Sequence, residues 1–293
     1  MTERSPSQPD PLGISFFWDA LAEDGLKRFR KQVLAWYKAH GRHQMAWRHT
    51  RDPYQILVSE IMLQQTQVGR VTTKFVEFIA AFPDFPALAT APLPIVLAVW
   101  QGMGYNRRAI ALKTCAERVM EEYGGCLPAD SRRLAELPGI GPATAASVCA
   151  FAFNLPVVFI ETNIRRVYIH YFFGDRERVA DTEILPLVEQ TLDRKNSRVW
   201  YWALMDLGAA LKTTVPNPNR RSRHYTRQAP FEGSDRQLRG MILRHLLWHR
   251  LMNKDAIIQV LPSDPGRSSR IIDALVSEGF LTCQRDGMLG ISE

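Results

Sequence analysis

Residues 137–147 read LPGIGPATAAS and lie between two segments with helical patterns, 131–136 and 142–153. Two glycines, Gly139 and Gly141, allow the backbone to turn sharply between these helices. The helix that begins near Pro142 directs unpaired amide hydrogens at whatever lies in front of it, and a phosphate is the natural ligand there. The sequence therefore predicts a phosphate-binding turn, with a plain turn between two helices as the alternative.

A Leu-Pro-Gly-Ile-Gly run followed by a helix of small residues is typical of a helix-hairpin-helix, which holds the DNA backbone without reading bases. We therefore expect contacts with a nucleic-acid backbone from the residues of this turn and of the helix after it, which are Leu137, Pro138, Gly139, Ile140, Gly141 and Thr144.

Outward from this turn, apolar residues recur at helical spacing, and strand signals are sparse before the C-terminal end. We therefore predict an all-α fold. The first twelve residues are polar and proline-rich, which indicates a disordered tail, and no apolar run is long enough to span a membrane. The other helices are expected near residues 17–40, 53–64, 68–82, 93–101, 107–123, 163–173, 182–192 and 197–211.

The charge of the chain indicates its kind of partner, and its cysteine content indicates the state of its thiols. The 293 residues contain 37 Lys plus Arg and 30 Asp plus Glu, a net charge of +7 that favours a polyanionic partner. Nine basic and two acidic residues lie between Lys212 and Arg250, so the excess is local, and the basic residues expected to contact DNA there are Arg220, Arg221 and Arg223. Four scattered cysteines have neither disulfide-framework nor zinc spacing, and we expect free thiols.

The last residues, 231–293, have their own pattern of three helices and a β-hairpin that turns at Asp286-Gly287. This order describes a small winged-helix-like domain, whose helix beginning at Arg267 would face a nucleic-acid groove. A protein-docking or lobe-stabilising appendage is the alternative. His245 and His249 are four residues apart on one of these helices, but no third metal ligand is evident, so we favour a non-metal role.

Two carboxylates have patterns that suit catalysis. Glu60 lies in VSEIMLQQTQV, residues 58–68, where apolar neighbours would resist its ionisation, as a general acid near neutral pH requires. Glu161 ends the apolar run of FIETNIRRV, residues 159–167, just before a new helix, where a carboxylate can stabilise a developing positive charge. The alternatives are a solvated helix glutamate for Glu60 and a charge that complements the helix dipole for Glu161.

These motifs, together with GMGYNRRA at 102–109 and ALMDLGA at 203–209, have the order and approximate spacing of one known family. The chain resembles the MutY-type adenine DNA glycosylases of the helix-hairpin-helix (HhH-GPD) superfamily over roughly residues 30–211. The resemblance implies a two-lobed helical fold with DNA in the cleft. One lobe of six helices would span about 53–165, the second would combine 13–52 with 166–211, and 212–230 would be a basic linker.

The resemblance also implies roles for individual residues. Glu60 matches the glutamate that protonates the purine leaving group at N7 and then helps to activate water. Glu161 stands where the family has an aspartate that stabilises the oxocarbenium-like sugar, and Asn163 matches a nearby asparagine. The target nucleotide must leave the base stack. Residues expected to fill the gap or to line the base pocket are Leu63, Gln64, Gln65, Tyr105, Asn106 and Ala143.

Four departures from the family pattern qualify the resemblance. Ala143 occupies the position of the nucleophilic lysine of endonuclease III, so a monofunctional enzyme is expected. Lys212 stands where MutY-type enzymes have their first iron-sulfur cysteine, so no cluster is expected, although a monovalent cation could bind carbonyl oxygens of the hairpin. Asn106 replaces a tyrosine, and no room remains for the family's large domain that senses 8-oxoguanine.

The sequence thus predicts a monofunctional DNA glycosylase that removes adenine opposite guanine or 8-oxoguanine and leaves an abasic site. We expect a monomer that binds double-stranded DNA with a mismatched or damaged base in the cytoplasm, at the nucleoid, without membrane contact. A glycosylase for mismatched thymine, uracil or another damaged base on the same scaffold is the first alternative. A non-catalytic DNA-binding protein is the second.

Overall fold

The computed structural model describes residues 12–14 and 23–293. Residues 1–11, which make up almost all of the predicted tail, and the first part of the helix predicted at 17–40 lie outside the described residues. The all-α prediction is confirmed for the described residues up to 249, whose named elements are helices. No described helix is both long and apolar enough to cross a membrane. The chain divides into two compact units.

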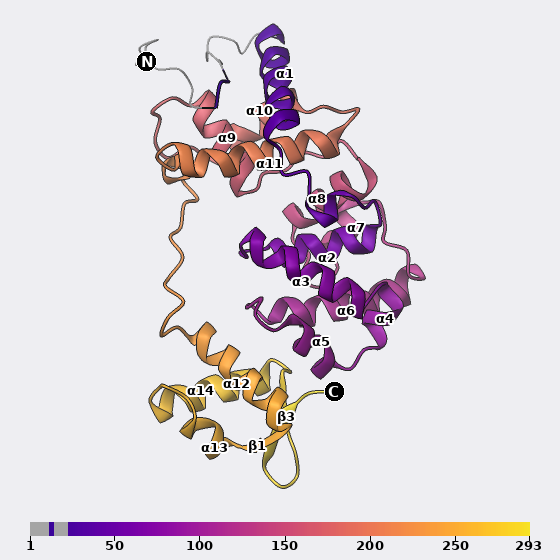
Figure 1. The fold of residues 1–293 in the computed structure, drawn as a ribbon, viewed down its shortest axis with the longest axis vertical. Helices are drawn as coiled ribbons and strands as arrows, with labels where there is room; N and C mark the ends of the chain where they lie inside the picture. Colours follow the sequence, from indigo (N-terminus) through magenta and orange to yellow (C-terminus); the bar gives the residue numbers. More distant parts are fainter. Residues whose placement is uncertain (1–11, 15–22) are drawn as a thin grey trace. The chain divides into compact units, whose positions relative to one another are not determined.

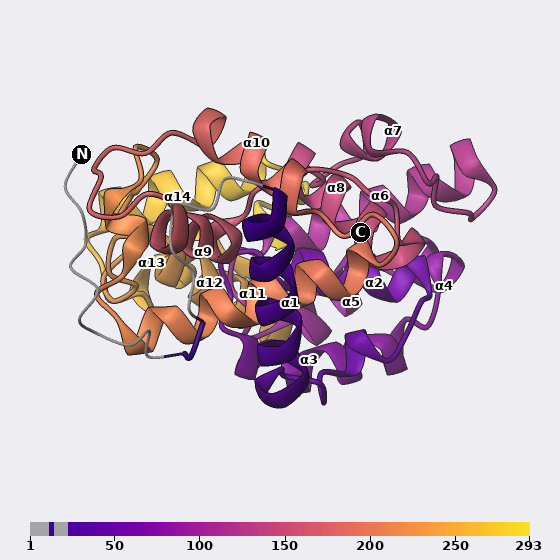
Figure 2. The same cartoon turned by 90° about the horizontal axis from the view of Figure 1, so that it is seen from above.

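Unit 1 contains Met1–Ile56, Ala129–Glu136 and Ile140–Arg227. In this unit α11 lies against both α9 and α1 (Figure 1 and Figure 2). The described helices are α1 (Glu23–His40), η1 (Ala46–Arg48), α7 (Ser131–Ala135), α8 (Pro142–Phe153), α9 (Thr162–Phe172), α10 (Asp181–Thr191), α11 (Ser197–Thr214) and η2 (Pro218–Arg221).

The contact between α11 and α9 depends on Gly208. A Cβ atom at this position would lie 2.2 Å from the carbonyl oxygen of Asn163, so only glycine allows the two helices to approach so closely. Trp200 and Tyr201 on α11 are fully buried and belong to the core of this unit, where their rings contact Phe29 and Phe159. Burial of such large side chains stabilises the unit.

A buried ion pair ties α11 to the segment after α1. Asp206 is 3% exposed, and its oxygens accept hydrogen bonds from Arg42 and Arg48 at 2.7 to 2.8 Å. Burial by itself would raise the pKa of Asp206, but the hydrogen bonds and charges of Arg48 and Arg42 hold it below its usual range. The guanidinium of Arg48 also lies over the rings of Tyr37 and Trp202.

Unit 2 contains Leu57–Pro128, Leu137–Gly139 and Gln228–Glu293, so the chain passes from unit 1 to unit 2 within α2. A six-residue helix, α4, was not predicted, because it is too short to show a helical period. Asp84 caps it by accepting a hydrogen bond from the Ala87 amide. The helices between residues 53 and 123 are α2 (Pro53–Leu63), α3 (Val68–Ala81), α4 (Phe85–Thr90), α5 (Leu93–Trp100) and α6 (Arg107–Tyr123).

The C-terminal part of unit 2 is a module of three helices and a small sheet. We define this C-terminal module as residues 235–293. The predicted β-hairpin, which turns at Asp286-Gly287, is confirmed as strands β2 and β3. A third strand, β1, was not predicted and makes the sheet antiparallel with the order β1-β3-β2. Its elements are α12 (Asp235–His249), β1 (Leu251–Asn253), α13 (Lys254–Gln259), α14 (Pro265–Ser277), β2 (Leu281–Cys283) and β3 (Met288–Ile291).

The expected groove-facing end of α14 requires correction. The expected groove-facing residues are Arg267, Ser268, Ser269 and Arg270. Ser268 is fully buried, and Arg267 is bound to the carboxylate of Asp235 and the carbonyl oxygen of Gly233. Arg270 is exposed. Of the two arginines, Arg270 is therefore the one whose side chain suits contact with a groove.

The compact units differ from the lobes that the resemblance implies. Residues 140–165, expected with 53–139, cluster instead with 166–227. The physical reason is that α8 packs on α11, where Arg198 donates to the carbonyl oxygens of Phe151 and Ala152 and the Tyr201 hydroxyl donates to that of Val157. The C-terminal module belongs to the same compact unit as residues 57–128.

Replacing Gly208 with alanine is expected to destabilise the protein by about 1–3 kcal/mol, because the new methyl group must push α9 and α11 apart. Thermal unfolding followed by circular dichroism would measure the loss. Gly240, in the middle of α12, is the matched control, since a Cβ there meets nothing within 4 Å. Gly240→Ala should be neutral or stabilising. Equal effects of the two substitutions would contradict the proposed steric constraint.

Candidate functional site

Glu161 is the N-cap residue of α9 in unit 1. Its Oε1 atom accepts hydrogen bonds from the backbone amides of Asn163 at 2.8 Å and Ile164 at 3.1 Å. The Asn163 side-chain amide lies 3.4 Å from Oε2. Burial raises the pKa of Glu161, and the two amides, Arg166 and Arg165 oppose this effect only in part. The carboxylate thus caps the helix, as the alternative interpretation stated, and is also held rigidly in a partly buried position.

Asn163 is in turn fixed by Arg166, which is 4% exposed. Arg166 donates to Asn163 Oδ1 at 2.7 Å, to the Gly208 carbonyl oxygen at 2.5 Å and to Asn217 Oδ1 at 3.1 Å. Sequence reasoning missed this residue. An arginine one helical turn after Asn163 was a usable signal, but its partners at positions 208 and 217 are distant in the sequence.

The segment after α11, expected as a basic linker, has a defined structure within unit 1. Asn219 is 5% exposed and donates to the carbonyl oxygen of Thr162 at 2.9 Å. Val179 and Ser222 form a parallel bridge. Residues 217–222 therefore hold the start of α9 in place, which a flexible linker could not do.

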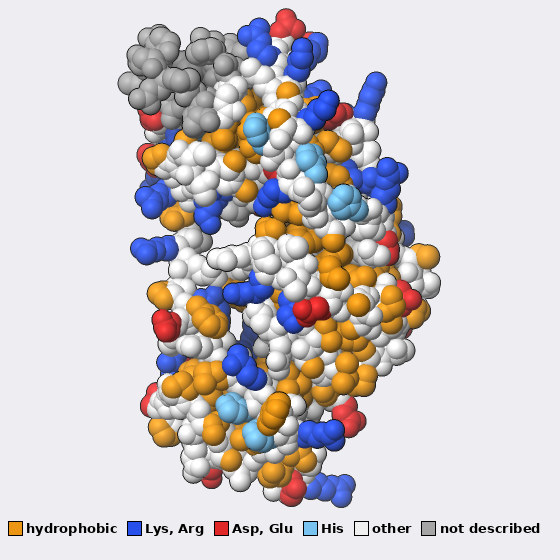
Figure 3. Space-filling model, viewed as in Figure 1, with side chains coloured by type: hydrophobic (Ala, Val, Ile, Leu, Met, Phe, Trp, Pro, Cys, Tyr) orange, Lys and Arg blue, Asp and Glu red, His pale blue; other side chains and the backbone are white. Residues whose placement is uncertain are grey.

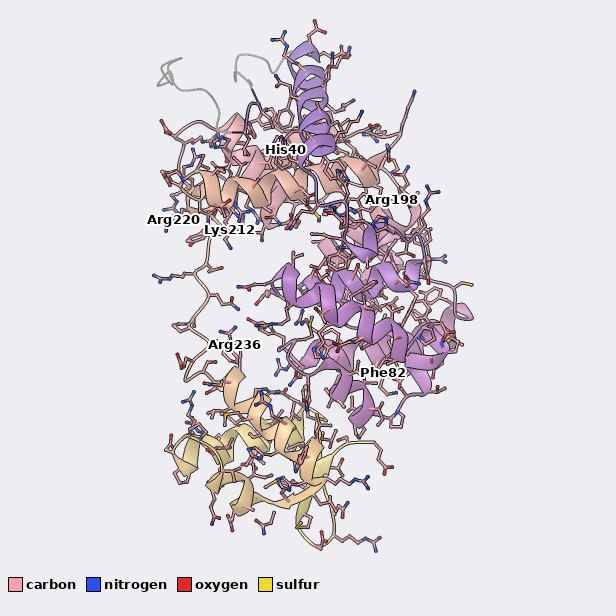
Figure 4. The ribbon with its side chains drawn as sticks, viewed as in Figure 1. His40, Phe82, Arg198, Lys212, Arg220 and Arg236 are labelled. Carbon is pink, nitrogen blue, oxygen red and sulfur yellow. The ribbon has the colours of Figure 1, made fainter. Side chains whose placement is uncertain are left out.

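The predicted basic residues of this segment differ in exposure. Arg220 and Arg223 are exposed, as DNA contact requires, but Arg221 is partly buried and its guanidinium lies 3.5 Å from the Ile169 carbonyl oxygen. Figure 4 labels Lys212 at the end of α11 and Arg220 in η2. Blue side chains follow the segment in Figure 3. The expectation of a DNA contact thus fits Arg220 and Arg223 better than Arg221.

The helix-hairpin-helix turn, residues 137–141, contains both buried and exposed residues. Leu137 and Ile140 are buried and anchor the turn, whereas Gly139 and Gly141 are exposed. Gly139 has a φ of +76°, and a Cβ there would lie 2.8 Å from that of Ala111. Gly141 is the N-cap residue of α8, so the helix begins directly after this exposed glycine.

Other predicted residues lie around this hairpin. Pro138 is partly buried and belongs to unit 2 with Leu137 and Gly139, whereas Ala143 and Thr144 belong to the first turn of α8 in unit 1. Ala143 is exposed and Thr144 is partly exposed. The side chain of Ala143 offers no amine for covalent chemistry.

Glu60 lies in the last turn of α2, in unit 2. It is partly buried, and its neighbours Ser59 and Ile61 are at most 1% exposed. This environment differs from that of a fully solvated helix glutamate. Leu63 and Gln64 are partly exposed, and Gln65 is exposed with a φ of +52°. The Gln64 side-chain amide lies 3.4 Å from the Gly139 carbonyl oxygen, so the end of α2 meets the hairpin.

Arg108 holds the end of α2, a role that sequence reasoning missed. One guanidinium nitrogen donates to the carbonyl oxygens of Ile61, Met62 and Gln64 at 2.6 to 2.9 Å. Burial lowers the pKa of Arg108 to about 10. Its guanidinium also lies 5.5 Å from the ring centroid of Tyr105, which has a φ of +48°. Asn106 follows as the N-cap residue of α6, without a side-chain capping bond.

Metal ligation has no support in residues 12–14 and 23–293, where no group of three or more His, Cys, Asp or Glu side chains could hold an ion. Cys115 and Cys149 are buried free thiols, and Cys126 and Cys283 are exposed free thiols. His245 and His249 stack with ring centroids 6.2 Å apart.

Comparisons with known proteins agree with the fold. Residues 58–188 match the family described as "HhH-GPD superfamily base excision DNA repair protein". A relative from Mycolicibacterium smegmatis named adenine DNA glycosylase is 33% identical over 279 residues, which are 89% of this chain and 95% of the relative. A thymine/uracil-DNA glycosylase from Methanothermobacter thermautotrophicus is 31% identical over 188 residues, which are 63% of this chain and 85% of the relative.

Solved structures of related enzymes have a similar fold. A thermostable thymine-DNA glycosylase matches with a TM-score of 0.59 at 31% identity, covering 63% of this chain and 86% of that one. A non-covalent complex of endonuclease III with DNA matches with a TM-score of 0.57 at 17% identity, covering 67% and 90%. The latter likeness concerns the fold alone.

Replacing Glu161 with glutamine should make stability less dependent on pH. A raised folded-state pKa means that the protonated carboxyl contributes stability below the unfolded pKa, and that this stability is lost as pH rises through the folded pKa. The melting temperature of Glu161→Gln relative to the wild type should therefore increase between about pH 4 and neutrality. Glutamine keeps an oxygen that can accept the two capping hydrogen bonds.

Glu183→Gln provides a control of opposite sign. A hydrogen bond from the Ala180 amide and the nearby Arg176 lower the pKa of Glu183, so its contribution is present above the unfolded pKa and is lost as pH falls. A constant difference between Glu161→Gln and the wild type over this pH range would contradict the burial effect on Glu161.

Proposed function

Because the chain belongs to the HhH-GPD superfamily of base excision DNA repair proteins, we propose that it removes adenine opposite guanine or 8-oxoguanine and leaves an abasic site. The observation that carries this proposal is the relative named adenine DNA glycosylase, whose alignment extends over nearly the whole of both chains. In the proposal the protein acts as a monomer on double-stranded DNA of the nucleoid.

The proposed chemistry uses Glu60 as a general acid and Glu161 as an electrostatic stabiliser. Protonation of purine N7 by Glu60 makes the base a better leaving group, and the bond between C1′ and N9 breaks with its electron pair moving to the base. The sugar becomes oxocarbenium-like, and the Glu161 carboxylate stabilises its positive charge. Water then adds to C1′ and loses a proton to Glu60, which restores the acid.

The local structure supports these roles. Glu60 is partly buried in the last turn of α2, between the buried residues Ser59 and Ile61. Glu161 has a rigid capping geometry, and Asn163 beside it is fixed by the buried Arg166. Catalysis by electrostatic stabilisation depends on such fixed groups, since they need no reorganisation during the reaction.

DNA would be held by the hairpin and by exposed basic residues. Gly139 and Gly141 are exposed at the hairpin, and Arg220 and Arg223 are exposed in the segment after α11. We propose that Leu63, Gln64 and Gln65 occupy the space left by the extracted nucleotide. We further propose that no iron-sulfur cluster is bound, because Lys212 stands at the first cysteine position, and that a monovalent cation can bind hairpin carbonyl oxygens.

A second candidate is excision of mismatched thymine or uracil on the same scaffold. It is favoured by the likeness to a thymine-DNA glycosylase structure at 31% identity, a value close to that of the relative named adenine DNA glycosylase. A third candidate, a DNA-binding protein without catalysis, predicts that no base is released from any duplex.

A duplex panel tests these candidates. Adenine, thymine, uracil or hypoxanthine is placed opposite guanine or 8-oxoguanine, and base release is followed under single-turnover conditions. We expect adenine release, with a rate lowered about 10²–10⁴-fold in Glu60→Gln while the duplex Kd is retained. The matched control is Glu77→Gln on α3, where the side chain is 48% exposed. Release of thymine without adenine would contradict the leading proposal.

Borohydride trapping tests monofunctional chemistry. Ala143 offers no amine at the position where endonuclease III has its lysine, so no covalent protein–DNA adduct should form during excision. Denaturing electrophoresis would detect an adduct, with endonuclease III as the positive control. A borohydride-dependent adduct would show that another amine forms a Schiff base, and that a monofunctional mechanism is wrong.

A further inference from the structure

Tyr105 contacts Gln228, which precedes the C-terminal module, and Arg236, which lies in its first helix. Its hydroxyl oxygen accepts hydrogen bonds from the side chains of Gln228 and Arg236. The Arg236 guanidinium also lies 5.2 Å from the Tyr105 ring centroid, and it donates to the Ala229 carbonyl oxygen at 2.8 Å. Arg236 lies in the first turn of α12, where Figure 4 labels it.

The same tyrosine ring contacts a second guanidinium, that of Arg108, at 5.5 Å. An aromatic ring presents negative π-density that attracts a cation, so two arginines on one ring are each stabilised by it. Arg108 also binds the carbonyl oxygens at the end of α2, the helix that carries Glu60. A continuous set of contacts therefore runs from Arg236 through Tyr105 and Arg108 to the end of α2.

Gln228 extends this set of contacts to the predicted gap-filling residues. Its side-chain amide lies 3.4 Å from Gln65 Oε1 as well as bonding Tyr105. Gln65 and Tyr105 both have left-handed backbones, with φ of +52° and +48°. Such conformations are unfavourable for residues other than glycine and persist where surrounding contacts impose them. Gln228 and Arg236 supply contacts of this kind to the two side chains.

A carboxylate fixes the C-terminal module to the start of α6. Glu278, after α14, forms ion pairs with Arg107 at 2.6 Å and with Arg239 at 2.5 Å. Hydrogen bonding from Arg107 and then from Arg239 lowers the pKa of Glu278 to about 2. Arg107 is the first residue of α6 and lies two residues after Tyr105. The module is thus attached where its Arg236 can reach the tyrosine.

We propose that Arg236 and Gln228 are positioning residues for nucleotide extraction, acting through Tyr105 and Gln65. In this assignment the C-terminal module supports Tyr105 and the proposed gap-filling residue Gln65, in place of the independent DNA-binding role expected from its winged-helix pattern. The inference rests on the proposed glycosylase function and assigns a role to residues that do not themselves touch the reacting atoms.

The test is a double-mutant cycle in the full-length protein with Arg236→Ala and Tyr105→Phe. The probe is a duplex with 2-aminopurine next to the target base, whose fluorescence rises on extraction. Arg236→Ala should slow extraction and single-turnover excision about tenfold, with Kd changed less than about twofold. Tyr105→Phe removes the shared hydroxyl, so the double variant should be much less impaired than the product of the single effects. Independent, multiplicative effects would overturn the inference.

Two further variants separate positioning from general damage. Arg236→Lys keeps a cation and a donor near the ring and should recover part of the extraction rate. Lys254→Ala removes a cation from the same module, where it pairs with Asp273, and should leave extraction unchanged. Melting temperatures identify variants that fail to fold, and Gln228→Ala then tests the same role at a second residue.

The outcomes also separate this inference from the proposed function. If the wild-type protein releases no base from any duplex, the proposed function fails. If it releases a base and Arg236→Ala and Gln228→Ala extract and excise it at wild-type rates, the positioning role alone is wrong.

Discussion

The start of α9 depends on one buried cation, Arg166. A buried guanidinium must have its N–H groups satisfied, and here the oxygens come from Asn163, Gly208 and Asn217. Those three residues belong to α9, to α11 and to the segment after α11. Helix packing and the geometry around Glu161 are therefore consequences of the same requirement. The close approach at Gly208 is what brings a main-chain oxygen within reach of Arg166.

Much of this architecture was predictable from local patterns. LPGIG predicted the glycine turn before α8, ETNIRRV predicted a carboxylate at a helix start, and Asp286-Gly287 predicted the hairpin. Each of these signals lies within a few residues of the structure it specifies. The two interpretations of Glu161 were treated as alternatives, but the structure shows that the residue caps α9 and is partly buried at the same time.

The contacts that could not be predicted join residues that lie far apart in the sequence. Arg108 binds carbonyl oxygens more than forty positions away, and Asn219 binds Thr162 across 57 positions. The sequence around Arg108 and around Asn219 contains no signal that would identify these distant partners. The six-residue α4 and the three-residue β1 were missed because a short element takes its stability from neighbours, as β1 does from β3. The ion pair of Arg267 was missed for the same reason, since its partner Asp235 lies 32 positions earlier.

The attachment of the C-terminal module by Glu278 has a consequence for solution conditions. With a pKa of about 2, this carboxylate stays ionised over the whole range in which a repair protein works, so acidity should not loosen the module. Arg107, however, is 71% exposed, and an ion pair with so much solvent access is screened by dissolved salt. The dependence of DNA affinity on ionic strength would then combine two processes. One is the release of counterions from phosphates, and the other is the weakening of the ion pair between Arg107 and Glu278. A curved rather than linear dependence of log K on log salt would be the mark of that combination.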